Sequence, residues 1–228
     1  MKTASEHHPS DHIERARQSL GQSEEAIYRL VAHTIEQKTS ISGTIIDVGC
    51  GSGNLHPYLQ GRFSRYVGVD ALRYEKFPRD AELVLADLNS TPWPLAEKVA
   101  DVVAAIEVIE HLENPRAFFR ELVRLVKPGG LVLVTTPNQQ SFLSLFTLIV
   151  KGRFSAFQDI HYPAHLTALL EIDLRRIAVE SSLTDIVVEY SLSGRIILTP
   201  WHYPQCLTLI SPRTFSDNLL LVGRMPLS

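Results

Sequence analysis

The chain has 228 residues, of which 45% are hydrophobic and 21% are charged, and its formal net charge is −3. This length fits a single α/β domain, and the composition is that of a globular protein with its own hydrophobic core. The small negative charge provides no positive field for nucleic acid, so we expect no nucleic-acid partner. Cys50 and Cys206 lie far apart without a CxxC motif, which argues against a disulfide framework.

No stretch of the sequence is apolar over the about 20 residues that a bilayer-spanning helix requires. The longest strongly apolar segment runs only from Phe142 to Val150, and the N-terminal residues lack the apolar core of a secretory signal. The sequence therefore predicts a cytoplasmic protein without a transmembrane segment.

The pattern of apolar residues predicts helices and strands that alternate along most of the chain. Residues 13–38 have helical periodicity, interrupted at Gly21, and residues 1–40 would form an N-terminal helical cap. Asn114 and Pro115 are typical of a helix start, and Lys127-Pro128-Gly129-Gly130 of a helix end. The predicted strands are 44–48, 66–69, 83–86, 99–106 and 131–135, with helices at 54–60 and 115–126 between them.

Farther along the chain we expect a helix at 167–181 and strands at 185–190 and 218–222, the last two forming an antiparallel hairpin at the sheet edge. Apolar strands that alternate with helices are typical of a parallel sheet covered on both faces. We therefore predict one α/β domain over residues 1–228, with a cofactor-binding core at 44–136 and an insert at 138–165 that covers an acceptor.

The first predicted strand leads into a glycine-rich loop, Asp47-Val48-Gly49-Cys50-Gly51-Ser52-Gly53. Glycines allow the backbone to turn sharply and to approach a ligand closely, and a helix that follows directs its N–H groups to the same place. The GxGxG spacing differs from the GxGxxG of dinucleotide-binding folds. Because Asp47 would also repel a pyrophosphate, an NAD-dependent oxidoreductase is disfavoured.

Carboxylates end the next two strands. Asp70 ends the second strand, where an acid accepts from ribose hydroxyls, and Asp87 ends the third, where an acid can accept from an adenine amine. Asp47 can balance an ammonium group. Ligands of open parallel sheets bind at the carboxyl ends of the strands, so the three acids predict a ligand with adenine, ribose and a charged amino-acid tail.

Four segments together resemble the class I S-adenosylmethionine-dependent methyltransferases: IIDVGCGSGN, VGVD, LADLNSTPWPL and ADVVAAIEVIEHLENPRAFFRELVRLVKPGGLVLVTTPN. The resemblance covers Ile45–Asn138 and is greatest to the small-molecule branch that carries an E-V-x-E-H segment. It implies a Rossmann-like, seven-stranded, mostly parallel sheet with an antiparallel last strand and helices on both faces.

The same resemblance implies S-adenosylmethionine as the cofactor. The glycine loop would hold the methionine part, the acids after strands two and three the ribose and the adenine, and Ile106 with Glu107 would line the methyl-donor side. The implied cofactor-binding residues are Asp47, Gly49, Gly51, Gly53, Asp70, Asp87, Leu88, Ile106 and Glu107.

His161 and His165 are the candidate catalytic residues. They flank Tyr162-Pro163 in the segment after the fifth strand, which covers the acceptor in the family that the chain resembles. A neutral imidazole near pH 7 can accept the proton of a hydroxyl acceptor as it is methylated. A surface loop with two solvated histidines is the alternative.

The segment with Glu107, Glu110 and His111 also resembles one in small-RNA 2′-O-methyltransferases and quinone-biosynthesis O-methyltransferases, where such residues can bind a metal. Asp159, His161 and His165 are further possible ligands downstream. We nevertheless expect Glu107 to face the cofactor and His111 to pack at a helix start, so our prediction is that no metal is bound.

The apolar helix over residues 142–150 has three possible roles: a lid over an apolar acceptor, contact with a membrane surface, or burial against the core or a second subunit. Trp201, His202 and Tyr203 either line the acceptor pocket or pack on the core. No feature of the sequence predicts the oligomeric state.

The sequence thus predicts methyl transfer from S-adenosylmethionine to an oxygen, or with less support a nitrogen, of a small molecule or glycan. A metal-dependent RNA 2′-O-methyltransferase is the first alternative, and the lack of a basic patch counts against it. A non-catalytic nucleotide-binding or partner-binding module is the second, and the complete set of glycines and acids counts against that.

Overall fold

The computed structural model describes residues 21–40 and 42–227, and the structural statements that follow concern this part of the chain. The polar segment at residues 1–12 and the first part of the predicted helix 13–38 lie outside the described residues. The second part of that helix is α2, Glu25–Lys38, and the predicted interruption at Gly21 falls in a turn before it.

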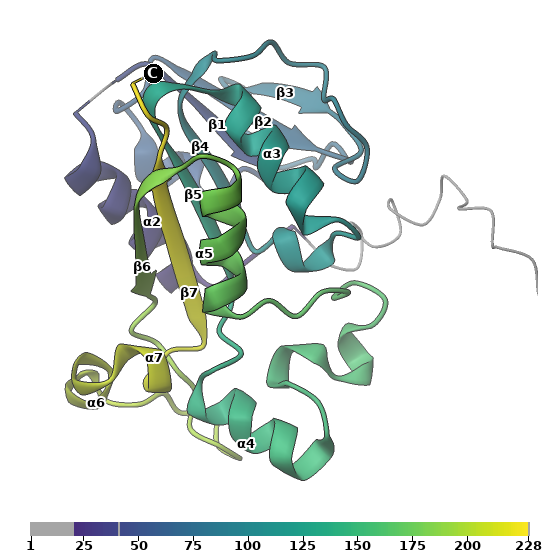
Figure 1. The fold of residues 1–228 in the computed structure, drawn as a ribbon, viewed down its shortest axis with the longest axis vertical. Coiled ribbons are helices and arrows are strands. Elements are labelled where there is room, and N and C mark those ends of the chain that lie inside the picture. Colours follow the sequence, from purple (N-terminus) through teal and green to yellow (C-terminus); the bar gives the residue numbers. More distant parts are fainter. Residues whose placement is uncertain (1–20, 41, 228) are drawn as a thin grey trace, which may run out of the picture.

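Seven strands form one sheet in the order β3-β2-β1-β4-β5-β7-β6 (Figure 1). Their bounds are Thr44–Val48 for β1, Arg65–Asp70 for β2, Glu82–Leu85 for β3, Ala100–Ile106 for β4, Val126–Pro137 for β5, Thr184–Tyr190 for β6 and Asn218–Arg224 for β7. Strands β1 to β5 pair in parallel, and β7 is antiparallel to both of its neighbours. The predicted sheet is confirmed, and β7 is the inner strand of the predicted hairpin.

Helices cover both faces of the sheet because each carries an apolar stripe. On one face lie α3, Pro115–Leu125, and α5, Glu171–Glu180; on the other lies α2 (Figure 1). The two helices on the first face bury Phe118, Leu122, Leu174 and Ile177 against β1, β4, β5 and β7. The opposite face buries Ile27, Val31 and Ile35 of α2 against the same strands.

Local interactions explain where the helices begin. The Oδ1 atom of Asn114 accepts from the backbone N–H of Ala117 at 3.0 Å, which confirms the predicted start of α3. The predicted helix 167–181 is shorter and begins at Glu171, where Oδ2 of Asp173 accepts from the backbone N–H of Leu170 at 3.1 Å. The preceding N–H groups of Leu166 and Thr167 donate to the carbonyl oxygen of Glu110 at 2.9 and 3.0 Å.

The other short elements lie between these strands and helices. The predicted helix 54–60 is only a 3-10 turn, η1, His56–Leu59. The remaining bounds are Ile109–His111 for η2, Phe142–Lys151 for α4, Ser155–Phe157 for η3, Asp159–His161 for η4, Gln205–Ile210 for α6 and Pro212–Phe215 for α7. Figure 1 shows α4, α6 and α7 together, beyond the end of β5 that leads into α4.

Helix α4 forms as predicted, but its apolar side chains are not buried against the core. Ile149 is 83% exposed and Val150 62%, whereas the polar Ser144 is buried. Burial against the core of the same chain is therefore wrong for most of this helix. The roles as a lid, a membrane contact or a subunit contact stay predictions. None of the described helices has the length and apolar character needed to cross a membrane.

Candidate active site

A cavity of about 830 Å³ lies at the carboxyl ends of the parallel strands. This is within the usual range for small-molecule and cofactor sites. The segment 21–28 contributes one wall, the loops after β1, β2, β3 and β4 form the floor, and residues 155–165 lie on another side. The cavity is lined by these predicted site residues: Asp47, Gly49, Asp70, Asp87, Leu88, Ile106, Glu107, His161 and His165.

Asp70 is fixed at the end of β2 by backbone donors. Its Oδ2 atom accepts from the N–H of Gly51 at 2.8 Å, and its Oδ1 atom accepts from the N–H of Leu72 at 3.1 Å. Burial raises the pKa of this carboxyl group, and the backbone hydrogen bonds oppose that rise. The glycine loop and Asp70 are thus joined by a hydrogen bond, and Asp70 lines the cavity together with Asp47 and Asp87.

Asp47, the last acid of β1, is also buried beneath the cavity. It accepts a short hydrogen bond from the hydroxyl group of Tyr66, and burial raises the pKa of its carboxyl group to about 7. The carboxyl group of Asp47 therefore titrates close to neutral pH. A positively charged ligand group would favour the ionised form.

The three loop glycines have different surroundings. Gly49 is among the residues that line the cavity, whereas Gly51 and Gly53 are not. A side chain on Gly51 would place its Cβ atom 2.2 Å from the carbonyl oxygen of Gly21, and one on Gly53 would meet Pro78 at 2.4 Å. All three glycines have positive φ angles, so the loop requires glycine for its conformation and for its close contacts.

The side chain of Asp87 accepts hydrogen bonds from within its own loop. Its Oδ1 atom accepts from the N–H of Asn89 at 3.0 Å and its Oδ2 atom from the hydroxyl of Ser90 at 2.9 Å. Each carboxylate oxygen can accept more than one hydrogen bond, so these contacts leave room for an adenine amine. Contact of Asp87 and Leu88 with adenine stays a prediction.

Glu107 begins the loop after β4 and is held by two other strands. Its Oε1 atom accepts from the hydroxyl of Thr135 in β5 at 3.0 Å, and its Oε2 atom from the amide of Asn218 in β7 at 2.8 Å. Burial raises the pKa of Glu107 to about 8, and these hydrogen bonds oppose the rise. Its carboxyl group borders the cavity, and the raised pKa favours the protonated form.

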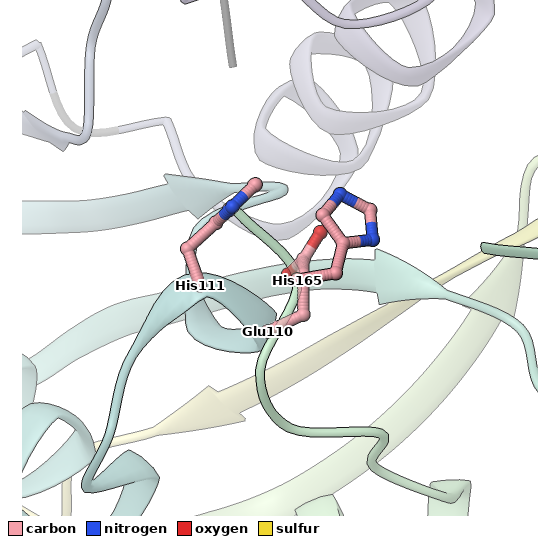
Figure 2. A group of neighbouring side chains, drawn as sticks. All are labelled: Glu110, His111 and His165. Atoms are coloured by element: carbon pink, nitrogen blue, oxygen red, sulfur yellow. The ribbon is translucent and has the colours of Figure 1, made fainter. Parts of the chain in front are cut away.

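Glu110, His111 and His165 line the cavity together although His165 comes from a distant segment (Figure 2). One possible ligand atom from each lies within 4.8 Å of the other two. The Oε2 atom of Glu110 accepts from Thr136 at 3.2 Å, and Oε1 has no hydrogen-bond partner within the described residues. Burial, followed by the nearby Glu107, raises the pKa of Glu110 well above its usual range.

Two of these histidines are oriented by backbone carbonyl groups. His111 donates from Nδ1 to Ala164 at 2.9 Å, and His165 donates from Nδ1 to Ala156 at 2.7 Å. In the neutral tautomer that these contacts favour, Nε2 carries the lone pair. Burial lowers the pKa of His165 to about 4, so its ring is neutral at physiological pH.

His161 joins this cluster from η4. Its ring lies 5.3 Å from that of His165, centroid to centroid, and its Nδ1 atom accepts from the N–H of Gln158 at 3.2 Å. Burial, and then the charge of Arg195, lowers the pKa of His161. Both predicted histidines thus border the cavity as neutral rings, while Asp159 forms an exposed ion pair with Arg153 outside the lining.

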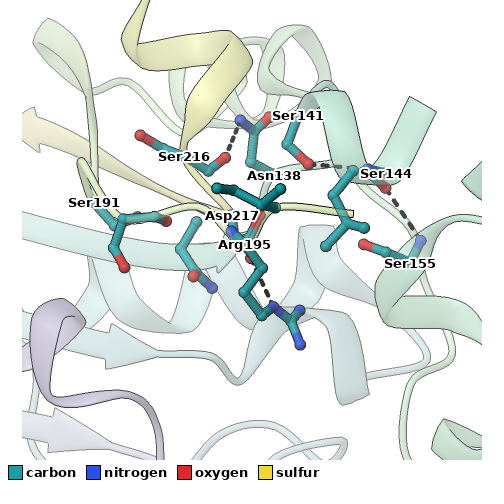
Figure 3. A network of polar contacts seen from close by, with 12 residues as sticks. Asn138, Ser141, Ser144, Ser155, Ser191, Arg195, Ser216 and Asp217 are labelled. Atoms are coloured by element: carbon teal, nitrogen blue, oxygen red, sulfur yellow. Dashed lines mark hydrogen bonds and ion pairs between the residues drawn. The ribbon is translucent and has the colours of Figure 1, made fainter. Parts of the chain in front are cut away.

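Sequence reasoning missed Arg195 and Asp217, which also line the cavity. The Nε atom of Arg195 donates to Oδ2 of Asp217 at 2.8 Å (Figure 3). Both residues lie in irregular segments next to β6 and β7, without periodicity or a motif to mark them. Asn218, which holds Glu107, was predicted only as the start of a strand. Trp201, His202 and Tyr203 are absent from the lining.

A profile of the methyltransferase domain family matches residues 15–184. Ubiquinone biosynthesis O-methyltransferases from Rickettsia typhi and Pseudomonas paraeruginosa are 34% identical over 112 residues and 32% identical over 124 residues. These alignments cover 46% and 50% of this chain and 46% and 53% of the relatives. The chain thus spans about half the length of the curated relatives it matches.

Solved structures have the same fold at low sequence identity. A chain of the complex between the Haloferax volcanii Trm112 methyltransferase activator and a methyltransferase gives a TM-score of 0.67 at 16% identity, covering 95% of this chain and 98% of that one. An S-adenosylmethionine-dependent methyltransferase from Archaeoglobus fulgidus gives 0.61 at 17% identity, covering 94% and 100%.

The family profile, the sheet order and the glycine loop agree, and the chain belongs to the methyltransferase domain family. Within it, the fold is that of the class I S-adenosylmethionine-dependent methyltransferases, as the resemblance implied.

Proposed function

We propose that this chain transfers a methyl group from S-adenosylmethionine to an oxygen atom of a small molecule. The proposal rests on one observation: Asp47 and Asp70, which lie beside the glycine loop, line the same cavity as His161 and His165. The names of the relatives, which are O-methyltransferases, support oxygen as the methylated atom.

The cofactor would lie along the ends of β1, β2 and β3. The backbone N–H groups of Gly51 and Leu72 hold the carboxylate of Asp70 in place, and its oxygen atoms would accept from the ribose hydroxyl groups. Asp47 would lie near the ammonium group of the methionine part, and Asp87 with Leu88 near the adenine. Because the donors to Asp70 are backbone groups, little side-chain entropy is lost when the ribose binds.

The reaction itself requires mainly alignment. The acceptor oxygen forms a bond to the sulfonium methyl carbon as the carbon–sulfur bond breaks, which leaves S-adenosylhomocysteine. The hydroxyl proton passes to a neutral imidazole, for which Nε2 of His165 is oriented by Ala156 and His161 is the neighbouring candidate. The low pKa of His165 keeps it neutral and ready to accept, but makes it a weak base.

A metal-assisted reaction is the second candidate. Oε1 of Glu110 has no partner in the described part of the chain, and with nearby nitrogen atoms of His111 and His165 it forms a donor set that fits a divalent cation. When bound, such a cation would polarise the acceptor oxygen and lower its pKa. Thr136 would keep its hydrogen bond to Oε2 of Glu110 and so hold this carboxyl group in place. Metal-free transfer stays our prediction.

Calorimetry with S-adenosylhomocysteine, S-adenosylmethionine and NAD tests the proposal. We expect micromolar affinity for the first two, which corresponds to about −8 kcal/mol, and no measurable binding of NAD. Tight NAD binding with no response to the two sulfur compounds would contradict the proposal. A non-catalytic module would bind them but would yield no methylated product from any acceptor.

A further inference from the structure

We infer that Arg195 recognises the methyl acceptor and that the acceptor carries an anionic group, for which a carboxylate is the best match. This inference rests on the proposed methyl transfer and specifies the chemistry of the second substrate. Among the described residues that line the cavity, Arg195 is the only lysine or arginine. Within this described lining, the guanidinium group of Arg195 therefore supplies the permanent positive charge.

The guanidinium group of Arg195 is held on one edge and open on the other. Its Nε atom donates to Oδ2 of Asp217 at 2.8 Å, and its backbone N–H donates to the same oxygen at 3.1 Å (Figure 3). Within the part of the chain that the structure describes, Nη1 and Nη2 have no hydrogen-bond partner. These two nitrogen atoms form the fork that binds both oxygen atoms of a carboxylate.

Asp217 is itself held by the backbone of two other segments. Its carbonyl oxygen accepts from the N–H of Asn138 at 2.7 Å, and its own N–H donates to the carbonyl of Ser193 at 2.8 Å. The amide group of Asn138 donates in turn to the carbonyl of Ser216 at 2.8 Å (Figure 3). Since Asp217 is fixed in this way, Arg195 is oriented before any ligand arrives.

The position of Arg195 favours the acceptor over the cofactor. The residues proposed for the ribose, the adenine and the ammonium group lie at the ends of β1, β2 and β3, and Ile106 with Glu107 at the end of β4, whereas Arg195 lies between β6 and β7, at the other side of the sheet order. His161, a candidate base, lines the same cavity. An anionic group on Arg195 would thus hold the acceptor on the side of the histidines. The Arg195 side chain is half exposed, so its pairing strengthens when the acceptor displaces water.

The test compares carboxylates with their neutral amides. Calorimetry would measure benzoate, cinnamate and hexanoate against benzamide, cinnamamide and hexanamide, with phenyl phosphate as a further anion, all at saturating S-adenosylhomocysteine. Wild-type protein, Arg195→Gln, Arg195→Lys and Arg116→Gln would be compared. Arg116 is a matched control because it forms an exposed ion pair with Glu180 outside the cavity.

We expect wild type and Arg116→Gln to bind at least one carboxylate about 10-fold or more tightly than its amide, the usual effect of a charged hydrogen bond. Arg195→Gln should lose this preference, Arg195→Lys should retain part of it, and the affinity for S-adenosylhomocysteine should be equal in all. A preference for phenyl phosphate that Arg195→Gln abolishes would support the anionic acceptor and replace carboxylate by phosphate.

Three results would overturn the inference: no anion preference in wild type, a preference that survives in Arg195→Gln, or a loss of S-adenosylhomocysteine binding in that variant alone. The last would assign Arg195 to the cofactor. Failure of the wild type to bind S-adenosylhomocysteine would instead contradict the proposed function, so the two failures are distinguishable.

Discussion

The hydroxyl group of Thr135 contacts Glu107 twice: it accepts from the backbone N–H at 2.9 Å and donates to Oε1 at 3.0 Å. Glu107 has a φ angle of 54°, in the left-handed region that costs a non-glycine residue about 1–2 kcal/mol. The two hydrogen bonds therefore stabilise a strained residue at the end of β4. They also fix the carboxyl group that borders the cavity.

We expect Thr135→Val to lower the free energy of unfolding by about 1–3 kcal/mol, because two buried groups lose their partner. Thr135→Ser keeps the hydroxyl group and should lose less. Urea denaturation of both variants measures the difference. An equal loss in both would mean that the methyl group of Thr135, and not its hydroxyl, is the stabilising part.

The glycine loop gives a second prediction, with a control in the same chain. Gly51 and Gly61 both have positive φ angles, but only the first would place a Cβ atom against Gly21, whereas the second faces open space. Alanine at either position should cost about 1 kcal/mol of stability for the backbone conformation. Only Gly51→Ala should also lower the affinity for S-adenosylhomocysteine, by displacing the segment at Gly21. Equal affinities would remove this loop from the site.

Asp47 links pH to stability. Its pKa of about 7 lies above the ordinary value, so its contribution to stability is present at low pH and is lost as the pH rises through about 7. Asp47→Asn should keep the acceptor for Tyr66 and raise the stability at pH 8, by at most about 4 kcal/mol. It should also weaken S-adenosylhomocysteine binding, because the ammonium group loses its counter-charge. Thermal unfolding from pH 5 to 8 and calorimetry measure both effects, and a variant that is less stable at pH 8 would contradict the assignment.

Glu110 distinguishes metal-free from metal-assisted transfer. Because burial raises the pKa of Glu110 well above its usual range and so favours the protonated form, Glu110→Gln should preserve the shape of the side chain and change turnover by less than about 10-fold. EDTA should leave the wild-type activity unchanged. A bound cation would give the opposite pattern: manganese binding by the wild type, lost in the variant, and activity that EDTA abolishes.

The histidines give the last prediction. His161→Ala or His165→Ala should lower turnover by about 10²–10⁴-fold, the usual effect of losing a general base, without a change in cofactor affinity. His165→Asn is a sharper variant, since its amide can still donate to the carbonyl of Ala156 but cannot accept the proton. Full turnover in all three variants would leave alignment alone as the source of catalysis.

The meeting of Asp47, Asp70 and Asp87 in one cavity was predictable because its signals are local. Each acid lies at or near the end of an apolar strand, and parallel strands bring their carboxyl ends to one edge. The contacts among the other lining residues were harder to predict from the sequence. Glu110 meets His165 only through the hydrogen bonds of its carbonyl group to the backbone at residues 166 and 167. Arg195 meets Asp217 only because β7 lies between β5 and β6, and no local pattern encodes that insertion.

The position of β7 has a consequence for the order of assembly. This strand comes last of the seven along the chain, yet it occupies an interior place in the sheet. Until β7 is synthesised, the free edge of β5 has no partner and β6 cannot join. Asn218 and Asp217, which hold Glu107 and Arg195, arrive with the same strand. During synthesis on the ribosome, we therefore expect the contacts between Asp70 and the glycine loop to form early, while Glu107 and Arg195 reach their partners only with β7.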